Sequence, residues 1–368
     1  MFWYKDYYII VEFFQVTDIF KLREENYILL ITMGFLSEIP DIAFKNPLFC
    51  SILGNTLLST VPGVSGAGAT PEKTLLTPVL DAELITWGAI TSHPVRPDTP
   101  TGCPTPASIT RAMMELCSLQ PLFINAGLRH LPTVPCLDVY GMIGEDPRFR
   151  DAVPRAEDLV RKGEVIGKLL SKSCDMLILG ECVPGGTTTA LCVMRALGYD
   201  ASVSSSFVTN PVSIKEEICR LAMGRIKTGK ITSPLDIIRY AGDPMMPVAV
   251  GIAKTYSGEL ILAGGTQMLA VSALLKEEGR SLPYVVTTSY VRDDPSANVR
   301  HIAEQIGLDI IFVDPGFGDI GHAGLARYCI GEVKEGMGAG GAMFLANLLG
   351  YSRDEIRKTI LTAVSAYS

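Results

Sequence analysis

Three glycine-rich segments of the chain carry carboxylate and hydroxyl side chains at spacings suited to a small anionic ligand. In the first, Leu177–Ala190, an apolar run predicted as a strand ends in a carboxylate, a glycine turn follows, and threonines open a helix. Glycines permit close backbone approach, and helix N-terminal amides attract anions, so this order suits one phosphate. No Gly-Lys-Ser/Thr follows, which excludes a Walker A loop, and a tight turn with a threonine N-cap is the alternative. The candidate binding residues are Glu181, Gly185, Gly186, Thr187 and Thr188.

The second segment, Ile261–Met268, repeats the order of strand, Gly-Gly-Thr and helix. Its candidate residues are Gly264, Gly265 and Thr266. Two such loops on neighbouring strands could grip a phosphate and its ribose from opposite sides. The alternative interpretation is two unrelated turns in left-handed conformation.

The third segment, Gly331–Gly341, concentrates glycines at a predicted helix start. Such glycines serve either close packing of helices or the presentation of a carboxylate, Glu335, to a ligand that the backbone must approach. From the residues alone both interpretations stay open. The candidates here are Glu335, Gly336 and Gly338.

These segments require a scaffold of alternating strands and helices. Short β-rich runs are predicted as strands at Leu84–Trp87, Leu122–Asn125, Met176–Leu179, Leu260–Ala263, Tyr284–Thr287 and Ile310–Val313. Helices are predicted at Ala107–Cys117, Arg155–Ser171, Thr188–Leu197, Ile214–Ile226, Pro247–Thr255, Met268–Glu277, Ala297–Ile306, Ala323–Cys329 and Arg353–Ala366, the last capped by Ser352. The alternation predicts an α/β fold with a doubly wound, mostly parallel, Rossmann-like sheet. A smaller helical lobe would come from the N- and C-terminal segments. Ligands of such sheets bind at the carboxyl ends of strands, where the glycine-rich segments fall.

Four regions are expected along the chain. Residues 1–36 form a hydrophobic N-terminal extension or docking segment, or translation starts at Met33. Residues 37–120 contribute to the small lobe and the sheet, and 121–320 form the main phosphoribosyl-binding domain. Residues 321–368 supply C-terminal helices of the small lobe and carry the candidate catalytic Glu.

Composition narrows the classes of partner. The formal net charge is −7 and no Lys/Arg-rich run occurs, so nucleic acid is a poor partner. No apolar run is long enough to cross a membrane, and the odd number of cysteines without a Cys-x-x-Cys pair indicates reduced thiols in the cytoplasm. Asp314, Asp319 and His322 are interpreted as loop residues, so no metal site is expected.

Three motifs together resemble the nicotinate-nucleotide–dimethylbenzimidazole phosphoribosyltransferase family of cobalamin biosynthesis, especially its archaeal and cyanobacterial branch. They are Gly-Ala-Thr-Pro-Glu at 68–72, Val-Pro-Gly-Gly-Thr-Thr-Thr-Ala at 183–190, and Lys-Glu-Gly-Met-Gly-Ala-Gly-Gly at 334–341. The resemblance extends from about Phe44 to the C-terminus. It is looser on the acceptor-base side, where Pro106–Arg111 only echoes the bacterial motif.

The resemblance implies a reaction. Nicotinate mononucleotide would place its phosphate on the two Gly/Thr loops, and a benzimidazole-like base would attack C1′ as nicotinate leaves. The β-glycosidic bond would be inverted to α, giving an α-ribazole phosphate-type product for the lower ligand of cobamides. Glu335 would be the general base, and Glu181 would orient the base or a ribose hydroxyl. No cofactor is implied, and the family suggests a homodimer.

Two alternatives to a transferase stay open. A non-catalytic nucleotide-binding protein would bury Glu335 in an ion pair, for example with Arg327 or Lys334, away from any cavity. A nucleosidase-like hydrolase would have a polar, open pocket with water on the carboxylate. A transferase requires an apolar slot beside Glu335, which the Met, Ala and Leu content of Met337–Leu349 permits.

Overall fold

Seven parallel strands form a single sheet in the computed structural model, which describes residues 34–68 and 70–366. Their order across the sheet is β3-β2-β1-β4-β5-β6-β7. The strands are β1 (Pro47–Gly54), β2 (Leu122–Gly127), β3 (Leu137–Asp138), β4 (Met176–Cys182), β5 (Glu259–Ala263), β6 (Tyr284–Thr288) and β7 (Ile310–Val313). Every residue of β4 is buried, as expected where helices cover both faces of a parallel sheet.

The strand order reverses between β1 and β4. From β1 the chain moves outward to β2 and β3, then returns to β4 and proceeds outward to β7. The two central strands pair from Pro47 with Met176 to Leu53 with Cys182, so their carboxyl ends are adjacent. A reversal of this kind leaves a crevice at the carboxyl ends of the two strands, where ligands of doubly wound sheets bind.

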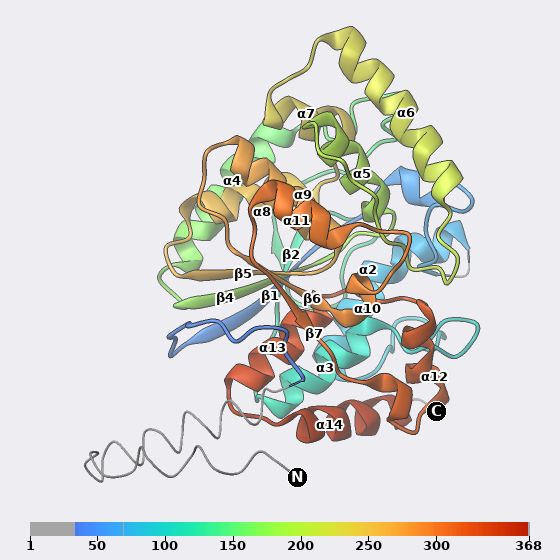
Figure 1. Cartoon of the computed structure of the whole chain (residues 1–368), viewed down its shortest axis with the longest axis vertical. Coiled ribbons are helices and arrows are strands. Elements are labelled where there is room, and N and C mark those ends of the chain that lie inside the picture. Colours follow the sequence, from blue (N-terminus) through green and yellow to red (C-terminus); the bar gives the residue numbers. More distant parts are fainter. Residues whose placement is uncertain (1–33, 69, 367–368) are drawn as a thin grey trace, which may run out of the picture.

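Helices cover both faces of the sheet, with α4, α5, α8, α9 and α11 on one and α3, α13 and α14 on the other (Figure 1). Alternate residues of β4 enter the two cores: Leu177 and Leu179 on the first face, Met176 and Ile178 on the second. The helices are α2 (Pro71–Trp87), α3 (Pro106–Leu116), α4 (Ala156–Leu170), α5 (Gly186–Ala196), α6 (Val212–Gly229), α7 (Pro234–Ala241), α8 (Met245–Thr255), α9 (Thr266–Glu277), α10 (Ser289–Arg292), α11 (Val299–Ile306), α12 (Ala323–Ala326), α13 (Ala339–Leu348) and α14 (Arg353–Ser365).

The predicted fold class is confirmed, but two elements near the N-terminus were assigned wrongly. Leu84–Trp87 is the last turn of α2 rather than a strand, and the central strand β1 was not predicted. A short apolar run does not distinguish a strand from a buried helix segment. The helix signals lie at its two ends: the Thr70 hydroxyl accepts a hydrogen bond from the Lys73 amide, and Gly88 ends α2 in the left-handed conformation.

The two ends of the described chain pack against the sheet and its second helical layer. Leu36 forms an antiparallel bridge with Val313 at the β7 edge, and residues 1–33 of the expected N-terminal extension lie outside the described residues. Ser352 caps α14 in a reciprocal pair with Glu355, which confirms the predicted cap. Within the described ranges, no helix combines the length and apolar composition of a membrane span.

Candidate functional site

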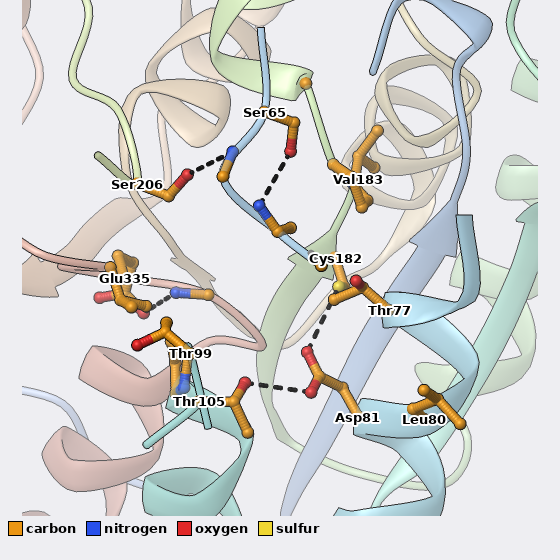
Figure 2. Close-up of a pocket in the computed structure, with 18 of the residues that line it drawn as sticks. Ser65, Thr77, Leu80, Asp81, Thr99, Thr105, Cys182, Val183, Ser206 and Glu335 are labelled. Carbon is orange, nitrogen blue, oxygen red and sulfur yellow. Dashed lines mark hydrogen bonds between the residues drawn. The ribbon is translucent and has the colours of Figure 1, made fainter. Parts of the chain in front are cut away.

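A cavity of about 660 Å³ opens at the carboxyl ends of the central strands. Its walls come from the loops after β1, β4 and β5, from α2, and from the segment preceding α13 (Figure 2). The lining includes residues 64–68, 181–187, 204–206, 265–267 and 333–336. The strand reversal between β1 and β4 therefore brings all three glycine-rich segments to one cavity.

Glu335 faces this cavity with its carboxylate held by backbone amides. Oε1 accepts from the amides of Gly336 (3.1 Å) and Gly340 (3.3 Å), and Oε2 accepts from Thr288 (3.2 Å) and Gly340 (3.3 Å). The side chain is half-buried and lines the cavity, and burial raises its pKa to about 7 although these amides favour the charged form. A carboxyl with such a pKa is half-ionised near neutral pH, which suits a general base.

Neither cation near Glu335 in the sequence forms an ion pair with it. Arg327 instead pairs with Glu332 (2.6 Å), and Lys334 pairs with Asp294 (3.3 Å). Among the described residues, no salt bridge to the Glu335 carboxylate is found. This arrangement differs from the one expected for a binding protein that has lost its acceptor site.

Glu181 is the second carboxyl of the cavity and is 4% exposed. Its Oε2 accepts hydrogen bonds from Gln267 Nε2 (2.7 Å) and the Val183 amide (3.1 Å). Burial raises its pKa to about 8, with further increases from Asp243 and Glu335. At neutral pH it is therefore mainly protonated, and its O–H can donate a hydrogen bond.

A polar part of the cavity wall is formed by hydroxyl groups with a buried lysine behind them. Lys215 Nζ donates to the Thr187 hydroxyl (3.0 Å) and to the Ser204 carbonyl (2.6 Å). Helix α5 begins beside them at Gly186, so the positive end of its dipole lies in this part of the cavity, although the Gly186 and Thr188 amides already donate to the Val183 and Gly185 carbonyls (2.9 and 3.0 Å). Burial, and next the neighbouring Lys334, lower the Lys215 pKa to about 7. Hydroxyls, helix amides and a cation together suit a phosphate group.

Sequence reasoning missed Lys215 and the serine loop, Ser204–Ser206, that lines the cavity. Lys215 lies in the amphipathic helix α6, where a lysine is ordinarily interpreted as a surface residue. Its burial depends on α6 packing beside α5. The Ser-Ser-Ser run was the one available signal, since hydroxyls before a helix are potential ligand donors.

The backbone around Glu335 adopts strained conformations. Val333, Lys334 and Met337 have φ of 66°, 69° and 50°, in the left-handed region that β-branched residues in particular avoid. Two long-range hydrogen bonds fix the segment, from the Val333 amide to the Ser206 carbonyl (3.0 Å) and from the Met337 amide to the Glu181 carbonyl (3.0 Å). Strain of this kind concentrates at functional sites, where the surrounding structure holds it in place.

Most of the predicted site residues converge on the cavity. Those that line it are Glu181, Gly185, Gly186, Thr187, Gly265, Thr266, Glu335 and Gly336. The Thr266 hydroxyl is buried and has no hydrogen-bond partner among the described residues, so it is available to a ligand. A Cβ on Gly265 would lie 4.0 Å from the Glu335 Cβ, which places the second loop beside the candidate base.

Three predicted residues lie outside the cavity lining: Thr188, Gly264 and Gly338. Thr188 is fully buried. Gly338 has φ of 67°, and a Cβ there would approach the Gly180 Cα to 3.1 Å, so close packing of the α13 start on β4 requires glycine. The packing interpretation of the third segment therefore applies at Gly338, whereas Glu335 and Gly336 reach the cavity.

The apolar wall comes from a different part of the chain than expected. None of the residues in Met337–Leu349 lines the cavity. Apolar side chains instead project from α2 and from the proline-rich segment after it, including Leu76, Leu80, Ile90 and Val95. The expectation failed because α13 turns its apolar residues into the core against the sheet.

No metal cluster is present in the described residues, and His322, considered as a ligand from its spacing, instead caps α12. Its Nδ1 accepts a hydrogen bond from the Leu325 amide (3.1 Å).

Solved structures of other proteins share the fold of this chain. Two solved structures share the fold: nicotinate-nucleotide-dimethylbenzimidazole phosphoribosyltransferase from Thermus thermophilus (TM-score 0.57, 16% identity, 91% of this chain and 95% of that chain) and CobT from the same organism (TM-score 0.56, 15% identity, with the same coverage). The resemblance inferred from the motifs is thus confirmed at the level of the fold.

Curated relatives are closer in sequence. UPF0284 proteins of Thermococcus gammatolerans and Methanosarcina acetivorans are 43% and 40% identical over 319 and 330 residues. The alignments cover 85% and 86% of this chain and 96% and 93% of the relatives. No protein-family model matches the chain. At this identity over nearly the whole length of the relatives, the chain belongs to the UPF0284 protein family.

Proposed function

We propose that the protein is a phosphoribosyltransferase that moves the phosphoribosyl group of nicotinate mononucleotide to a benzimidazole-like aromatic nitrogen base, with inversion from β to α. One observation carries the proposal: Glu335, a carboxyl without a salt bridge among the described residues, lines a cavity that combines an apolar wall with hydroxyls backed by a buried lysine. The fold shared with CobT supports this assignment.

The polar part of the wall suits the nucleotide phosphate. The Thr187 hydroxyl, the serine loop and the N-terminus of α5 would surround it, while Lys215 supplies positive charge behind them. The protonated Glu181 and the free Thr266 hydroxyl line the same cavity and would hydrogen-bond the ribose hydroxyls.

The reaction is a displacement at C1′. A ring nitrogen of the acceptor base forms the new C–N bond as the bond to nicotinate breaks, and the electron pair returns to the pyridine nitrogen. The acceptor loses its ring N–H proton to Glu335, whose pKa of about 7 permits proton uptake at neutral pH. Because attack comes from the face opposite the leaving group, the product is the α-nucleotide.

The test is to incubate the purified protein with nicotinate mononucleotide and a panel of benzimidazoles, purines and phenols. Mass spectrometry follows nicotinate release and α-nucleotide formation. Base-dependent α-product is expected, and Glu335→Gln should lower kcat by about 10²–10⁴-fold. Glu304→Gln, a matched change of an exposed glutamate on α11, should leave the rate unchanged.

Two results would replace the proposal. Nicotinate release without added base indicates the hydrolase, with water in place of the acceptor. Nucleotide binding without turnover of any base indicates the non-catalytic binding protein.

A further inference from the structure

Besides Glu181 and Glu335, the cavity has a further buried carboxyl, Asp81 on α2, that the proposed reaction does not use. Asp81 is 7% exposed. Its Oδ1 accepts a hydrogen bond from the Thr105 hydroxyl (3.0 Å), and its Oδ2 accepts one from the Cys182 thiol (3.8 Å), as Figure 2 shows. No cation pairs with it among the described residues. Each of its oxygens has two lone-pair sites, so acceptor capacity remains on a group that lines the cavity.

Several apolar side chains line the cavity near Asp81, although Thr77 on the same helix and Thr99 also line it. On the same face of α2, Leu76 and Leu80 line the cavity, and Ile90 and the proline-rich segment continue the wall. A buried carboxyl with a neutral hydroxyl and a weak thiol as its donors is poorly compensated. A ligand that supplied an N–H or O–H donor would complete its hydrogen bonding, whereas a wholly apolar ligand would leave it uncompensated.

Asp81 also lies close to the proposed position of the acceptor base. Thr105, its hydrogen-bond donor, is followed by Pro106, and a Cβ on Gly336 would lie 3.3 Å from Pro106 Cγ. The Gly336 amide in turn donates to Glu335. Residues at the start of α3 therefore contact both the Asp81 side chain and the backbone beside Glu335, and both carboxyls line one cavity beside the apolar wall.

We propose that Asp81 is a specificity-determining residue that accepts a hydrogen bond from the acceptor base, and that this base carries an N–H or O–H donor on the ring edge remote from its attacking nitrogen. This inference rests on the transferase function proposed above. It narrows the acceptor class from benzimidazoles in general to those with a polar donor edge. An acceptor with only methyl groups on that edge would be a poor substrate.

The test uses two acceptors of nearly equal shape, 5-aminobenzimidazole and 5-methylbenzimidazole. For the unaltered protein, kcat/KM with the amino compound is expected to exceed that with the methyl compound by about 10- to 100-fold. In Asp81→Asn, the side chain keeps a carbonyl for Thr105 but presents donor hydrogens in place of the second acceptor oxygen. The preference should fall below about 3-fold in this variant, and in Asp81→Leu it should reverse in favour of the methyl compound.

A purely structural role for Asp81 predicts a different pattern. Both acceptors would then lose rate in equal proportion in the variants, and their ratio would stay constant. Thr105→Val removes the donor but keeps the carboxyl, so it should preserve the preference for the amino compound. Equal use of both acceptors by the unaltered protein would overturn the Asp81 inference alone. Absence of base-dependent product with every acceptor would instead overturn the transferase proposal.

Discussion

Replacement of Glu181 by glutamine should stabilise the folded protein at alkaline pH and change its stability little in acid. The Glu181 side chain is 4% exposed, and burial raises its pKa from an ordinary 4.5 to about 8. The folded chain therefore holds a proton that the unfolded chain releases between these pH values. Stability from this group is fully present below pH 4.5 and is lost as the pH rises toward 8.

The size of the effect follows from the shift in pKa. Each unit is worth about 1.4 kcal/mol, so an ionised Glu181 destabilises the folded state by roughly 5 kcal/mol above its folded pKa. Glutamine does not titrate. It also retains one oxygen to accept from Gln267 Nε2 and the Val183 amide, the two donors to Glu181 Oε2. The glutamine variant should therefore avoid the loss of folding stability at alkaline pH without creating a cavity.

The assay is urea unfolding of both proteins at several pH values from about 5 to 9, with the free energy of unfolding extrapolated to water. The difference in unfolding free energy between the variant and the unaltered protein should be below about 1 kcal/mol at pH 5 and grow to about 5 kcal/mol at pH 9. Other buried carboxyls titrate in both proteins, so their contributions largely cancel in the difference. Glu304→Gln, at an exposed site, supplies the baseline and should show no such growth.

A difference that stays constant with pH would refute the reasoning. Glu181 would then be ionised in the folded protein at neutral pH, and it could not donate a hydrogen bond to a ribose hydroxyl.

Three further predictions concern the proposed reaction. Because the pKa of Glu335 is raised to about 7 and the base form is the active one, kcat at saturating nicotinate mononucleotide should rise with pH through about 7, and Glu335→Gln should abolish this rise in a pH-rate profile. Lys215→Met should raise KM for nicotinate mononucleotide by at least about 10-fold with a smaller change in kcat, as measured by steady-state kinetics. In the unaltered protein, nucleotide binding should weaken as the pH rises through about 7, because Lys215 loses its charge in this range. Gly340→Ala should lower kcat because a Cβ would lie 2.8 Å from Glu335 Oε2. In the control Gly224→Ala, the Cβ meets open space in α6, so kcat should stay unchanged and the thermal midpoint should rise slightly. Equal rates for the two variants would contradict the role of the backbone amides that hold Glu335.

Local patterns determined the α/β class and the positions of most elements after Leu122. Alternating apolar runs and amphipathic stretches have periods that differ between strands and helices, and these periods are properties of the sequence itself. Where one short apolar run fits both periods, as at Leu84–Trp87, the local signal was ambiguous, and a helix formed because Thr70 and Gly88 supply its ends. The central strand β1 also escaped prediction, because its position between β2 and β4 depends on pairing across long sequence separations.

Some residues of the candidate site could be predicted from the sequence, and others could be assigned only from the packing. The glycine-rich motifs selected Glu335, Glu181 and Thr187 from the sequence, because residue types at strand ends and helix starts already limit the chemistry. The third segment stayed ambiguous until packing separated Gly338, which contacts β4, from Glu335, which faces the cavity.

Only the tertiary structure decided how Lys215 and Asp81 contribute. Both lie on helices whose patterns are equally compatible with solvent exposure, and they are buried because α6 packs beside α5 and α2 forms a wall of the cavity. Burial is a property of the assembled fold, and it changes the charge state of these groups through desolvation, which no local pattern encodes. The sequence by itself therefore determined the fold class and the reactive motifs, while long-range packing decided which buried groups complete the site.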